Sequence, residues 1–495
     1  MYLLGYDIGS SSIKAALVEA ATGQAIAIAH SPDTEMEIVA LQTGWAEQNP
    51  EIWWQHVCLA TQKLLHEQQV SPDDIKGIGI SYQMHGLVVV DKNQRSLRPA
   101  IIWCDSRAVE IGNRAFDQIG HEKCLSHLLN SPGNFTASKL KWVKENEPAI
   151  YQRIHLFMLP GDFIAMKLTG EPMTTASGLS EGILWDFKKD GIADLVLDHY
   201  GLDEKLIPHI APTFSLQGEL TQSAADATGL RKGIPVAYRA GDQPNNALSL
   251  NVLQPGEVAA TGGTSGVVYG VVDQPVYDPP SRVNGFAHVN HLKETPRIGI
   301  LLCINGAGIQ YSWVRHNMAA GAVSYHEMER MAAAVPVGSD GLRILPFGNG
   351  AERMLENRST GAHVSNLQFN RHSQAHFYRA ALEGIAFSFI HGVKILQGMG
   401  LNVSVIRVGN DNLFQSAIFS NTISTLLDSR IEMIETTGAV GAAKAAGVAT
   451  GYYASIDEAM HNQKVLKTYQ PVLNFSHCVE AFSAWAADLS KLTET

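Results

Sequence analysis

Short apolar segments separated by glycine and hydroxyl-bearing residues make up the first thirty positions of the chain. Apolar runs occupy residues 2–6, 13–18 and 25–29, and the breaks between them hold Gly9-Ser10-Ser11-Ser12 and Thr22-Gly23. Such runs, bounded by turn-forming residues, predict three β-strands joined by tight turns.

The pattern changes at Pro50, where apolar side chains begin to recur at a spacing near 3.6 residues and predict a helix. Apolar runs at 78–80, 87–90 and 100–103 predict buried strands. The segment 110–230 holds mostly helix-like stretches broken by prolines. Strands that alternate with helices predict an α/β fold.

The second half of the chain repeats the opening pattern. A predicted strand at 234–240 is followed by a glycine-rich hairpin formed by 258–261 and 265–271, and a long helix is predicted at 374–396. A strand at 405–408 and a small-residue helix at 438–451 complete the pattern. We therefore expect two lobes, 1–250 and 251–495, whose similar hairpins suggest an old duplication.

Composition narrows the class of protein. Apolar residues make up 45% of the chain and charged residues 17%, which is typical of a globular protein. The net charge is −11 and no basic run exceeds two residues, so nucleic-acid binding is disfavoured. No apolar stretch approaches the ~18 residues of a membrane span. The five scattered cysteines favour reduced thiols and a cytoplasmic location.

The first hairpin is a candidate phosphate site. Asp7 stands at a strand end, and Gly9, Ser10, Ser11 and Ser12 follow it, with Lys14 close behind. Backbone N–H groups and hydroxyls in such a turn can bind phosphate oxygens, and the carboxylate can hold Mg²⁺ through water. The alternative is an ordinary hairpin turn, in which Gly, Ser and Asp are common.

The second hairpin, Thr261 to Gly266, is the matching candidate. Its glycines, Gly263 among them, and hydroxyls such as that of Thr264 allow close backbone approach to an anion. By itself it could equally be a structural turn. A nucleotide gripped between two lobes would need one such turn from each side.

Three further positions follow predicted strands. Asp242 could be a general base at a strand end or a helix N-cap. Gln83-Met84-His85 could bind a polyol through amide and imidazole hydrogen bonds, although Met84 could be core and His85 an ordinary turn residue. Asp105 could position a sugar or simply pair with Arg107.

Taken in order from residue 2 to residue 451, these segments resemble the FGGY family of carbohydrate kinases. The likeness extends to Asn305-Gly306-Ala307-Gly308 and to Tyr378 through Phe387. The resemblance implies a two-lobed, actin-like ATPase (ribonuclease H-like) fold with a central cleft, and a homodimer. It also implies ATP and Mg²⁺ as cofactors, with Asp242 as proton acceptor and both Asp7 and Asp242 near the metal.

The resemblance also carries residue roles for nucleotide and sugar. It places Gly306, Gly409 and Asn412 at the nucleotide, and Gln243 beside the base at the substrate. In two places the chain departs from the family pattern. Asn410-Asp411-Asn412 stands where Gly-Gly-Ala is usual, and Gln243-Pro244 stands where Asn is expected.

Within the family, Gln83-Met84-His85-Gly86 and Trp45 through Pro50 are similar to the group that phosphorylates D-xylulose at O5. An aspartate at its ordinary pKa of about 3.9 would act as an ionised base at pH 7. The alternatives are a kinase for gluconate, ribulose or a hexulose, or an actin-like protein that binds nucleotide and sugar without catalysis.

Overall fold

A five-stranded sheet with the strand order β13-β5-β1-β2-β3 forms the centre of the N-terminal lobe. Strands β1, β2 and β3 are antiparallel, whereas β1, β5 and β13 run parallel to one another. The bounds are β1 (Tyr2–Ile8), β2 (Ile13–Glu19), β3 (Ala25–Ser31), β5 (Ile75–Tyr82) and β13 (Val236–Gly241). The computed structural model describes residues 1–318, 323–410, 413–472 and 476–494. The three opening strands predicted from the sequence are confirmed.

Two helices cover this sheet, and one of them comes from the far end of the chain. Helix α1 (Pro50–Gln68) packs on β2 and β3, and α15 (Gly438–Ala449) packs on β1 and β5. The approach of α15 is close, because a Cβ at Gly5 or Gly79 would lie 1.9 Å from a carbonyl oxygen of that helix. Helix α15 lies after the predicted boundary near residue 250 but packs on the sheet of the first lobe, so this boundary does not divide the chain completely.

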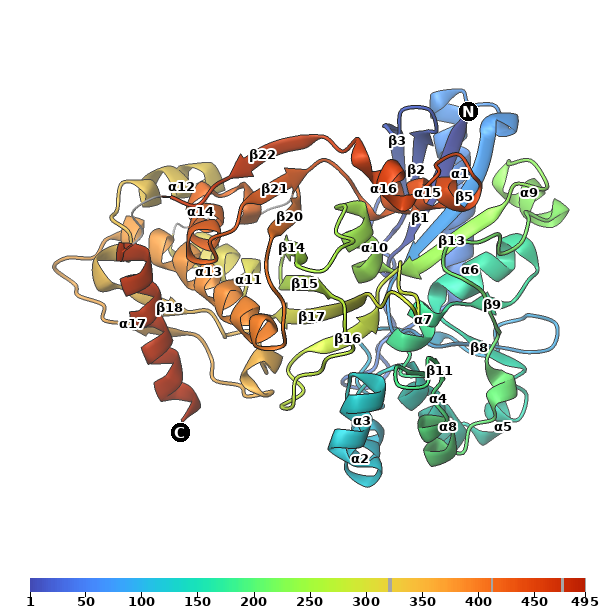
Figure 1. The fold of residues 1–495 in the computed structure, drawn as a ribbon, viewed down its shortest axis with the longest axis horizontal. Helices are drawn as coiled ribbons and strands as arrows, with labels where there is room; N and C mark the ends of the chain where they lie inside the picture. Colours follow the sequence, from blue (N-terminus) through green and yellow to red (C-terminus); the bar gives the residue numbers. More distant parts are fainter. Residues whose placement is uncertain (319–322, 411–412, 473–475, 495) are drawn as a thin grey trace.

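The segment between β5 and β13 forms an insertion beside the first sheet (Figure 1), and the helices predicted within 110–230 are confirmed. Its helices are α2 (Val109–Ile119), α3 (His121–Leu128), α4 (Thr136–Asn146), α5 (Pro148–Tyr151), α6 (Pro160–Thr169), α7 (Ala176–Glu181), α8 (Asp194–Tyr200) and α9 (Gln222–Thr228). Short strand pairs join them: β4 (Glu47–Gln48) with β7 (Ala100–Ile101), β6 (Val88–Val90) with β8 (Leu156–Met158), β9 (Met173–Thr174) with β12 (His209–Ile210), and β10 (Trp185–Asp186) with β11 (Gly191–Ile192). The strand predicted at 100–103 ends at Ile101, which leaves Trp103 in a turn.

The second lobe is built on a seven-stranded sheet with the order β16-β17-β15-β14-β20-β21-β22. Its strands are β14 (Glu257–Gly262), β15 (Gly266–Val272), β16 (Asn284–Ala287), β17 (Ile298–Ile304), β20 (Val405–Gly409), β21 (Ile431–Ile434) and β22 (Val465–Tyr469). Three antiparallel strands (β17, β15, β14) followed by two parallel ones (β20, β21) repeat the topology of the first sheet. This repetition agrees with the similarity of the two hairpins in the sequence.

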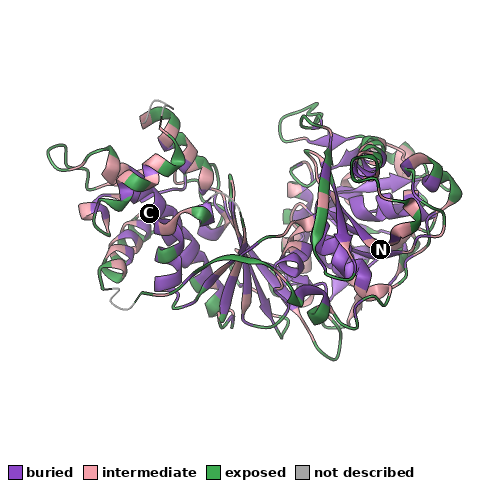
Figure 2. Cartoon of the chain, turned by 90° about the horizontal axis from the view of Figure 1, so that it is seen from above, coloured by how far each residue is buried: buried purple, intermediate pink, exposed green. Residues whose placement is uncertain are grey.

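Helices and one further strand pair complete the structure. They are α10 (Asp242–Ser249), α11 (Gly308–Met318), α12 (Tyr325–Ala333), α13 (Gln374–Gly398), α14 (Ala417–Leu426), α16 (Ile456–His461), α17 (Ser476–Thr493), and β18 (Arg343–Leu345) with β19 (His363–Ser365). Figure 2 shows that buried residues concentrate in the two sheets. None of the described helices is long and apolar enough to cross a membrane. All five cysteines are free thiols.

Candidate active site

Two carboxylates lie together where parallel strands of the first sheet end. Asp7 is next to last in β1, and Asp242 opens α10 directly after β13. Because β1 and β13 both pair with β5 in parallel, their carboxyl ends meet at one edge of the sheet, where α/β proteins gather ligands. Burial, followed by the charge of Asp7, raises the pKa of Asp242 to about 7.

Neighbouring polar and charged groups partly offset the effect of burial on the pKa values of Asp7 and Asp242. Burial raises the pKa of Asp7, while the Lys14 ammonium group and Ser81 act in the opposite direction. Hydrogen bonds from Gln243 likewise lower the pKa of Asp242 against the effect of burial. The predicted partners Lys14 and Gln243 therefore both favour the ionised carboxylates.

The N-terminus of α15 also faces this pair. A Cβ on Gly438 would lie 3.2 Å from Asp7 Oδ2, and Asn245 Nδ2 donates a hydrogen bond to the Gly438 carbonyl oxygen at 2.9 Å. A helix N-terminus carries partial positive charge, which favours nearby anions. A side chain at residue 438 would therefore press on the Asp7 carboxylate and force it to shift.

The first hairpin turn is braced from two sides. Gly9 N–H donates to the Ser12 carbonyl oxygen at 3.2 Å, and Gln48 Nε2 donates to the Ser10 carbonyl oxygen at 2.7 Å. Trp103 Nε1 donates to Ser10 Oγ at 3.2 Å, although the Trp103 side chain is half exposed. Ser11 is exposed at the tip of the turn. We assigned no role to Trp103 from the sequence, where its position at the end of a predicted strand was the available signal.

The Gln83–His85 turn follows β5, next to the two carboxylates. Gln83 is buried, yet its side-chain amide has no hydrogen-bond partner among the described residues. A buried amide without a partner is costly, so a ligand or a water molecule bound there would stabilise it. Met84 packs against Gly241 instead, since a Cβ at Gly241 would lie 2.7 Å from Met84 Cγ.

His85 contacts a residue that the sequence analysis missed. Its backbone N–H donates to Glu181 Oε2 at 3.1 Å, and its ring Nδ1 lies 2.9 Å from the Glu181 carbonyl oxygen. Burial lowers the pKa of His85 to about 3, so the ring is neutral at physiological pH. Glu181 lies about one hundred residues further along the chain, and no sequence spacing linked it to this turn.

Asp105 pairs with Arg107, which is the second of the two alternatives that the sequence left open, and not with a sugar as the first proposed. It is fully buried, and its oxygens accept hydrogen bonds from the Ala46 N–H at 2.6 Å and from Arg107 Nε and Nη2 at 2.9 and 2.6 Å. The Arg107 guanidinium group in turn lies over the Trp45 ring at 3.8 Å. Asp105 therefore stabilises the loop that carries Trp103, and its oxygens are already occupied.

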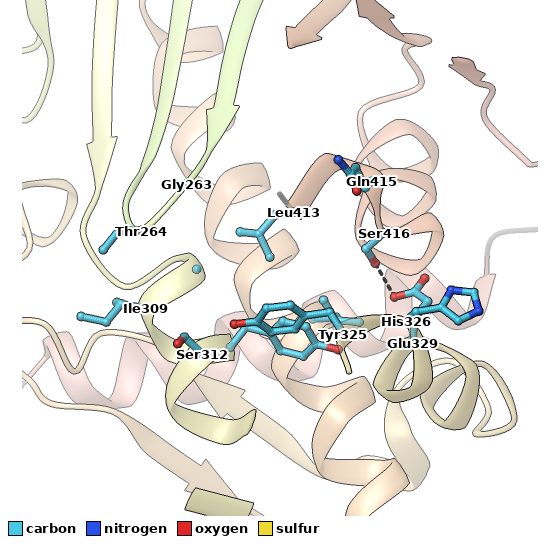
Figure 3. Close-up of a pocket in the computed structure, with 13 residues that line it drawn as sticks. Gly263, Thr264, Ile309, Ser312, Tyr325, His326, Glu329, Leu413, Gln415 and Ser416 are labelled. Atoms are coloured by element: carbon cyan, nitrogen blue, oxygen red, sulfur yellow. Dashed lines mark hydrogen bonds between the residues drawn. The ribbon is translucent and has the colours of Figure 1, made fainter. Parts of the chain in front are cut away.

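A pocket of about 510 Å³ opens in the second lobe next to the second hairpin (Figure 3). Gly263 and Thr264 border it, as do Gly308, Ile309, Tyr311, Ser312, Tyr325, His326, Glu329, Leu382, Leu413, Gln415 and Ser416. Tyr311 and Tyr325 stack with ring centroids 5.4 Å apart, and Glu329 accepts a hydrogen bond from Ser416 Oγ at 2.7 Å. The pocket joins a flat aromatic wall to a glycine-hydroxyl turn.

The start of α11 fixes the second hairpin turn. The N–H groups of Gly308 and Ile309 donate to the carbonyl oxygens of Gly263 and Thr264, both at 3.0 Å. Residue 308 must be glycine, because a Cβ there would lie 2.2 Å from the Gly263 oxygen.

Gly306 and Gly409, which were also expected at the nucleotide, do not line this pocket. Gly306 is buried against the second-lobe backbone, where a Cβ would lie 1.8 Å from the Pro346 oxygen, and Gly308 borders the pocket in its place. Gly409 ends β20, shortly before the pocket residues that begin at Leu413. Asn412 lies outside the described residues.

The second sheet approaches Asp242 at the end of β17. Burial raises the pKa of the Cys303 thiol, with Asp242 among the nearby charges that act on it. Ile304 pairs with Gly266, which starts β15 at the second hairpin turn. Asp242 thus faces the lobe that holds the pocket.

Among the described residues, no three or more histidine, cysteine, aspartate or glutamate side chains form a metal cluster. Asp7 and Asp242 together offer two hard oxygen donors. Mg²⁺ in nucleotide sites is typically held by one or two carboxylates together with substrate phosphates, so this pair fits the ion.

Comparison with known proteins gives a consistent result. Residues 2–249 match the N-terminal domain of the FGGY family of carbohydrate kinases, and residues 258–450 match its C-terminal domain. The chain is 28% identical to a xylulose kinase of Bacillus subtilis, over 92% of this chain and 90% of that protein. Two solved structures share the fold over 99% of this chain: a xylulose kinase from Rhodospirillum rubrum (TM-score 0.88, 24% identity, 99% of that chain) and a gluconate kinase from Lactobacillus acidophilus (TM-score 0.88, 20% identity, 98% of that chain).

Proposed function

Since the chain belongs to the FGGY family of carbohydrate kinases, we propose that it transfers the γ-phosphoryl group of ATP to O5 of D-xylulose. The two-lobed α/β fold and the carbohydrate kinase activity follow from the family. The acceptor sugar, the metal and the residue roles are our proposal.

One observation carries the proposal: Asp242 lies beside Asp7 and next to the Gln83–His85 turn, and it faces the lobe that holds the pocket. Phosphoryl transfer needs an acceptor hydroxyl, a base and a phosphate site in one place, because catalysis is mostly positioning and charge stabilisation. Here the base lies between a polar turn suited to a polyol and a lobe suited to a nucleotide.

Asp242 orients the terminal hydroxyl of the sugar and accepts its proton as the bond to phosphorus forms. Its pKa of about 7 corrects the expectation of an ordinary aspartate, because burial and Asp7 both disfavour its ionised form. A base with a pKa near the working pH is well suited to proton transfer. About half of the Asp242 side chains would be ionised at pH 7 before substrates bind.

Asp7 and Asp242 would hold Mg²⁺, which neutralises charge on the transferred phosphoryl group when bound. The backbone N–H groups and hydroxyls of Ser10, Ser11 and Ser12 supply phosphate contacts on one side, where Gly9 shapes the turn, and the turn at Gly263 and Thr264 supplies them on the other. The wall formed by Tyr311 and Tyr325 stacks against the base of the nucleotide, where aromatic contact is favourable.

A substrate panel tests the acceptor. ADP production would be followed with ATP and Mg²⁺ and with D-xylulose, D-ribulose, a hexulose or D-gluconate as acceptor. We expect the highest kcat/KM for D-xylulose. A higher kcat/KM for another acceptor would replace the proposed substrate while leaving the carbohydrate kinase activity in place.

Gluconate is the second candidate, because the fold is shared with a gluconate kinase. A substrate that carries a carboxylate, such as gluconate, would be bound best by a turn that places a cation beside it, here the Gln83–His85 turn. Lys139 is a buried basic residue at this turn, but burial lowers its pKa to about 7 and its Nζ donates to the carbonyl oxygens of His85 and Ile102 at 2.9 Å each. Because these hydrogen bonds engage Lys139, the geometry favours a neutral sugar.

A further inference from the structure

His85 has a strained backbone at the proposed sugar turn. Its φ of 61° lies in the left-handed region, which residues other than glycine adopt only when their surroundings hold them there. Its N–H donates to Glu181 Oε2 at 3.1 Å, and its carbonyl oxygen accepts from Lys139 Nζ at 2.9 Å. The conformation therefore depends on two buried side chains from the helical insertion.

Glu181 also sets the orientation of the His85 ring. Its carbonyl group lies at the end of α7, where the last carbonyl oxygens of a helix lack partners within the helix. Since a carbonyl oxygen can only accept, the proton of the neutral ring resides on Nδ1, 2.9 Å away. The other ring nitrogen, Nε2, is left as an acceptor.

The surroundings leave Nε2 for a ligand. Among the described residues no hydrogen-bond partner of Nε2 is found, and the His85 side chain is 22% exposed. The ring lies between Phe135 and Phe286, at centroid distances of 4.7 and 5.5 Å. Neither aromatic ring can satisfy an acceptor in the plane of the imidazole, whereas a sugar hydroxyl can.

The Glu181 carboxyl group links this turn to the strand end that carries Asp242. The side chain is 2% exposed, and a Cβ at Gly241 would lie 3.0 and 3.1 Å from its two oxygens. The helix that carries Glu181 is anchored on the second lobe: Ser177 Oγ donates to the Ala287 carbonyl oxygen at 2.9 Å, and the Ala287 N–H donates to Ser180 Oγ at 3.0 Å. The position of the carboxyl group is thus fixed from both lobes.

We propose that Glu181 is a positioning residue for the phosphoryl acceptor. Its carboxyl group holds His85 against the Gly241–Asp242 strand end, so that His85 Nε2 accepts a hydrogen bond from one hydroxyl of the sugar. This inference rests on the proposed function of the Gln83–His85 turn as the sugar site.

Kinetics of Glu181→Ala and Glu181→Gln test the proposal with D-xylulose and ATP. We expect Glu181→Ala to raise the KM for the sugar at least about tenfold, since it leaves the buried His85 N–H without its acceptor. The KM for ATP and the ATPase rate without sugar should stay within about twofold. Glu181→Gln should restore the sugar KM to within about threefold of wild type, because its amide oxygen can accept the His85 N–H bond.

Glu383→Ala is the matched control. Glu383 is another buried glutamate, and it accepts a hydrogen bond from Arg379 within α13 of the second lobe. We expect this change to lower the unfolding temperature without raising the KM for the sugar. If Glu181→Ala does not fold, Glu181→Leu keeps the volume of the side chain and gives the same readout.

Three results would overturn the inference: an unchanged sugar KM in Glu181→Ala, an equal loss toward sugar and ATP, or no rescue by Glu181→Gln. The proposed function fails by a different result, which is the absence of D-xylulose phosphorylation by the wild-type protein. Glu181→Ala, Glu181→Gln and Glu383→Ala would then be compared with the acceptor that gives the highest kcat/KM in the panel. The same criteria would decide the role of Glu181.

Discussion

At the scale of single residues, Asp242 combines the chemistry of a general base with a high electrostatic cost of burial. Its carboxylate is buried next to Asp7, and its pKa is about 7 for that reason. Replacing Asp242 with asparagine keeps the shape and removes the base. We expect kcat to fall by about 10²–10⁴-fold with little change in either KM. Steady-state kinetics check this, and near-wild-type turnover by the folded variant would exclude Asp242 as the base.

The same substitution should stabilise the protein when no ligand is bound. The pKa of Asp242 is higher in the folded state than the value near 3.8 of an unfolded chain, so its contribution to stability is lost as pH rises through that interval. Asp242→Asn avoids this loss. Its advantage in unfolding temperature over wild type should therefore be small at pH 4 and grow up to pH 7. A constant difference across that range would contradict the raised pKa.

Activity should depend on pH through the same group. Only the ionised carboxylate accepts a proton, so kcat/KM for the sugar should fall below pH 7, with an apparent pKa near 7 on the acid side. Higher Mg²⁺ should shift this pKa downward, because a nearby cation favours the ionised form. A pH–rate profile at two Mg²⁺ concentrations measures both effects, and a flat profile between pH 5 and 8 would be inconsistent with this assignment.

At the scale of secondary structure elements, the contact between α11 and the second hairpin should control nucleotide binding. Gly308→Ala would place a Cβ 2.2 Å from the Gly263 oxygen and displace the turn. We expect the KM for ATP to rise at least about tenfold, while the KM for the sugar changes little. The distance lies far below normal contact, so backbone movement is unavoidable.

Gly398→Ala is a suitable control for this experiment, because open space surrounds a Cβ at the end of α13. It should leave both KM values unchanged. Equal effects of the two alanine substitutions on the KM for ATP would show that the hairpin contact does not position the nucleotide.

At the scale of the whole molecule, the sequence predicted the elements better than their assembly. Apolar periodicity located both hairpins and the long helix α13, since local spacing decides which face is buried. It could not show that α15 returns to the first sheet, which depends on glycine–backbone contacts at Gly5 and Gly79.

Local sequence spacing was also unable to show which residues meet at the site through the tertiary fold. Asp7, Asp242 and the Gln83–His85 turn were predicted because each follows a strand, but Glu181 reaches them only through the tertiary fold. Asp105 met the same strand-end criterion, and the sequence offered its pairing with Arg107 only as an alternative; the contact with the Ala46 N–H, which decides between the two, could be seen only in three dimensions.

Movement of the two lobes relative to each other is also a property of the whole molecule. Asp242, the proposed base, belongs to the first lobe and lies near Cys303 of the second, so sugar binding should favour a closed state that excludes water from the γ-phosphate. We expect the ATPase rate without sugar to be low, and ADP release to rise at least about a hundredfold when a ketopentose is added. Equal rates of ADP release with and without sugar would contradict closure.

The pairing of Asp242 with an acceptor sugar is tested most directly by phosphorus NMR of D-xylulose incubated with ATP, Mg²⁺ and either wild type or Asp242→Asn. We predict one new phosphomonoester signal, assigned to phosphate on O5, that appears with wild type and is at least about a hundredfold slower with the variant. The absence of any sugar phosphate with wild type, or its formation at equal rates by both proteins, would contradict the account.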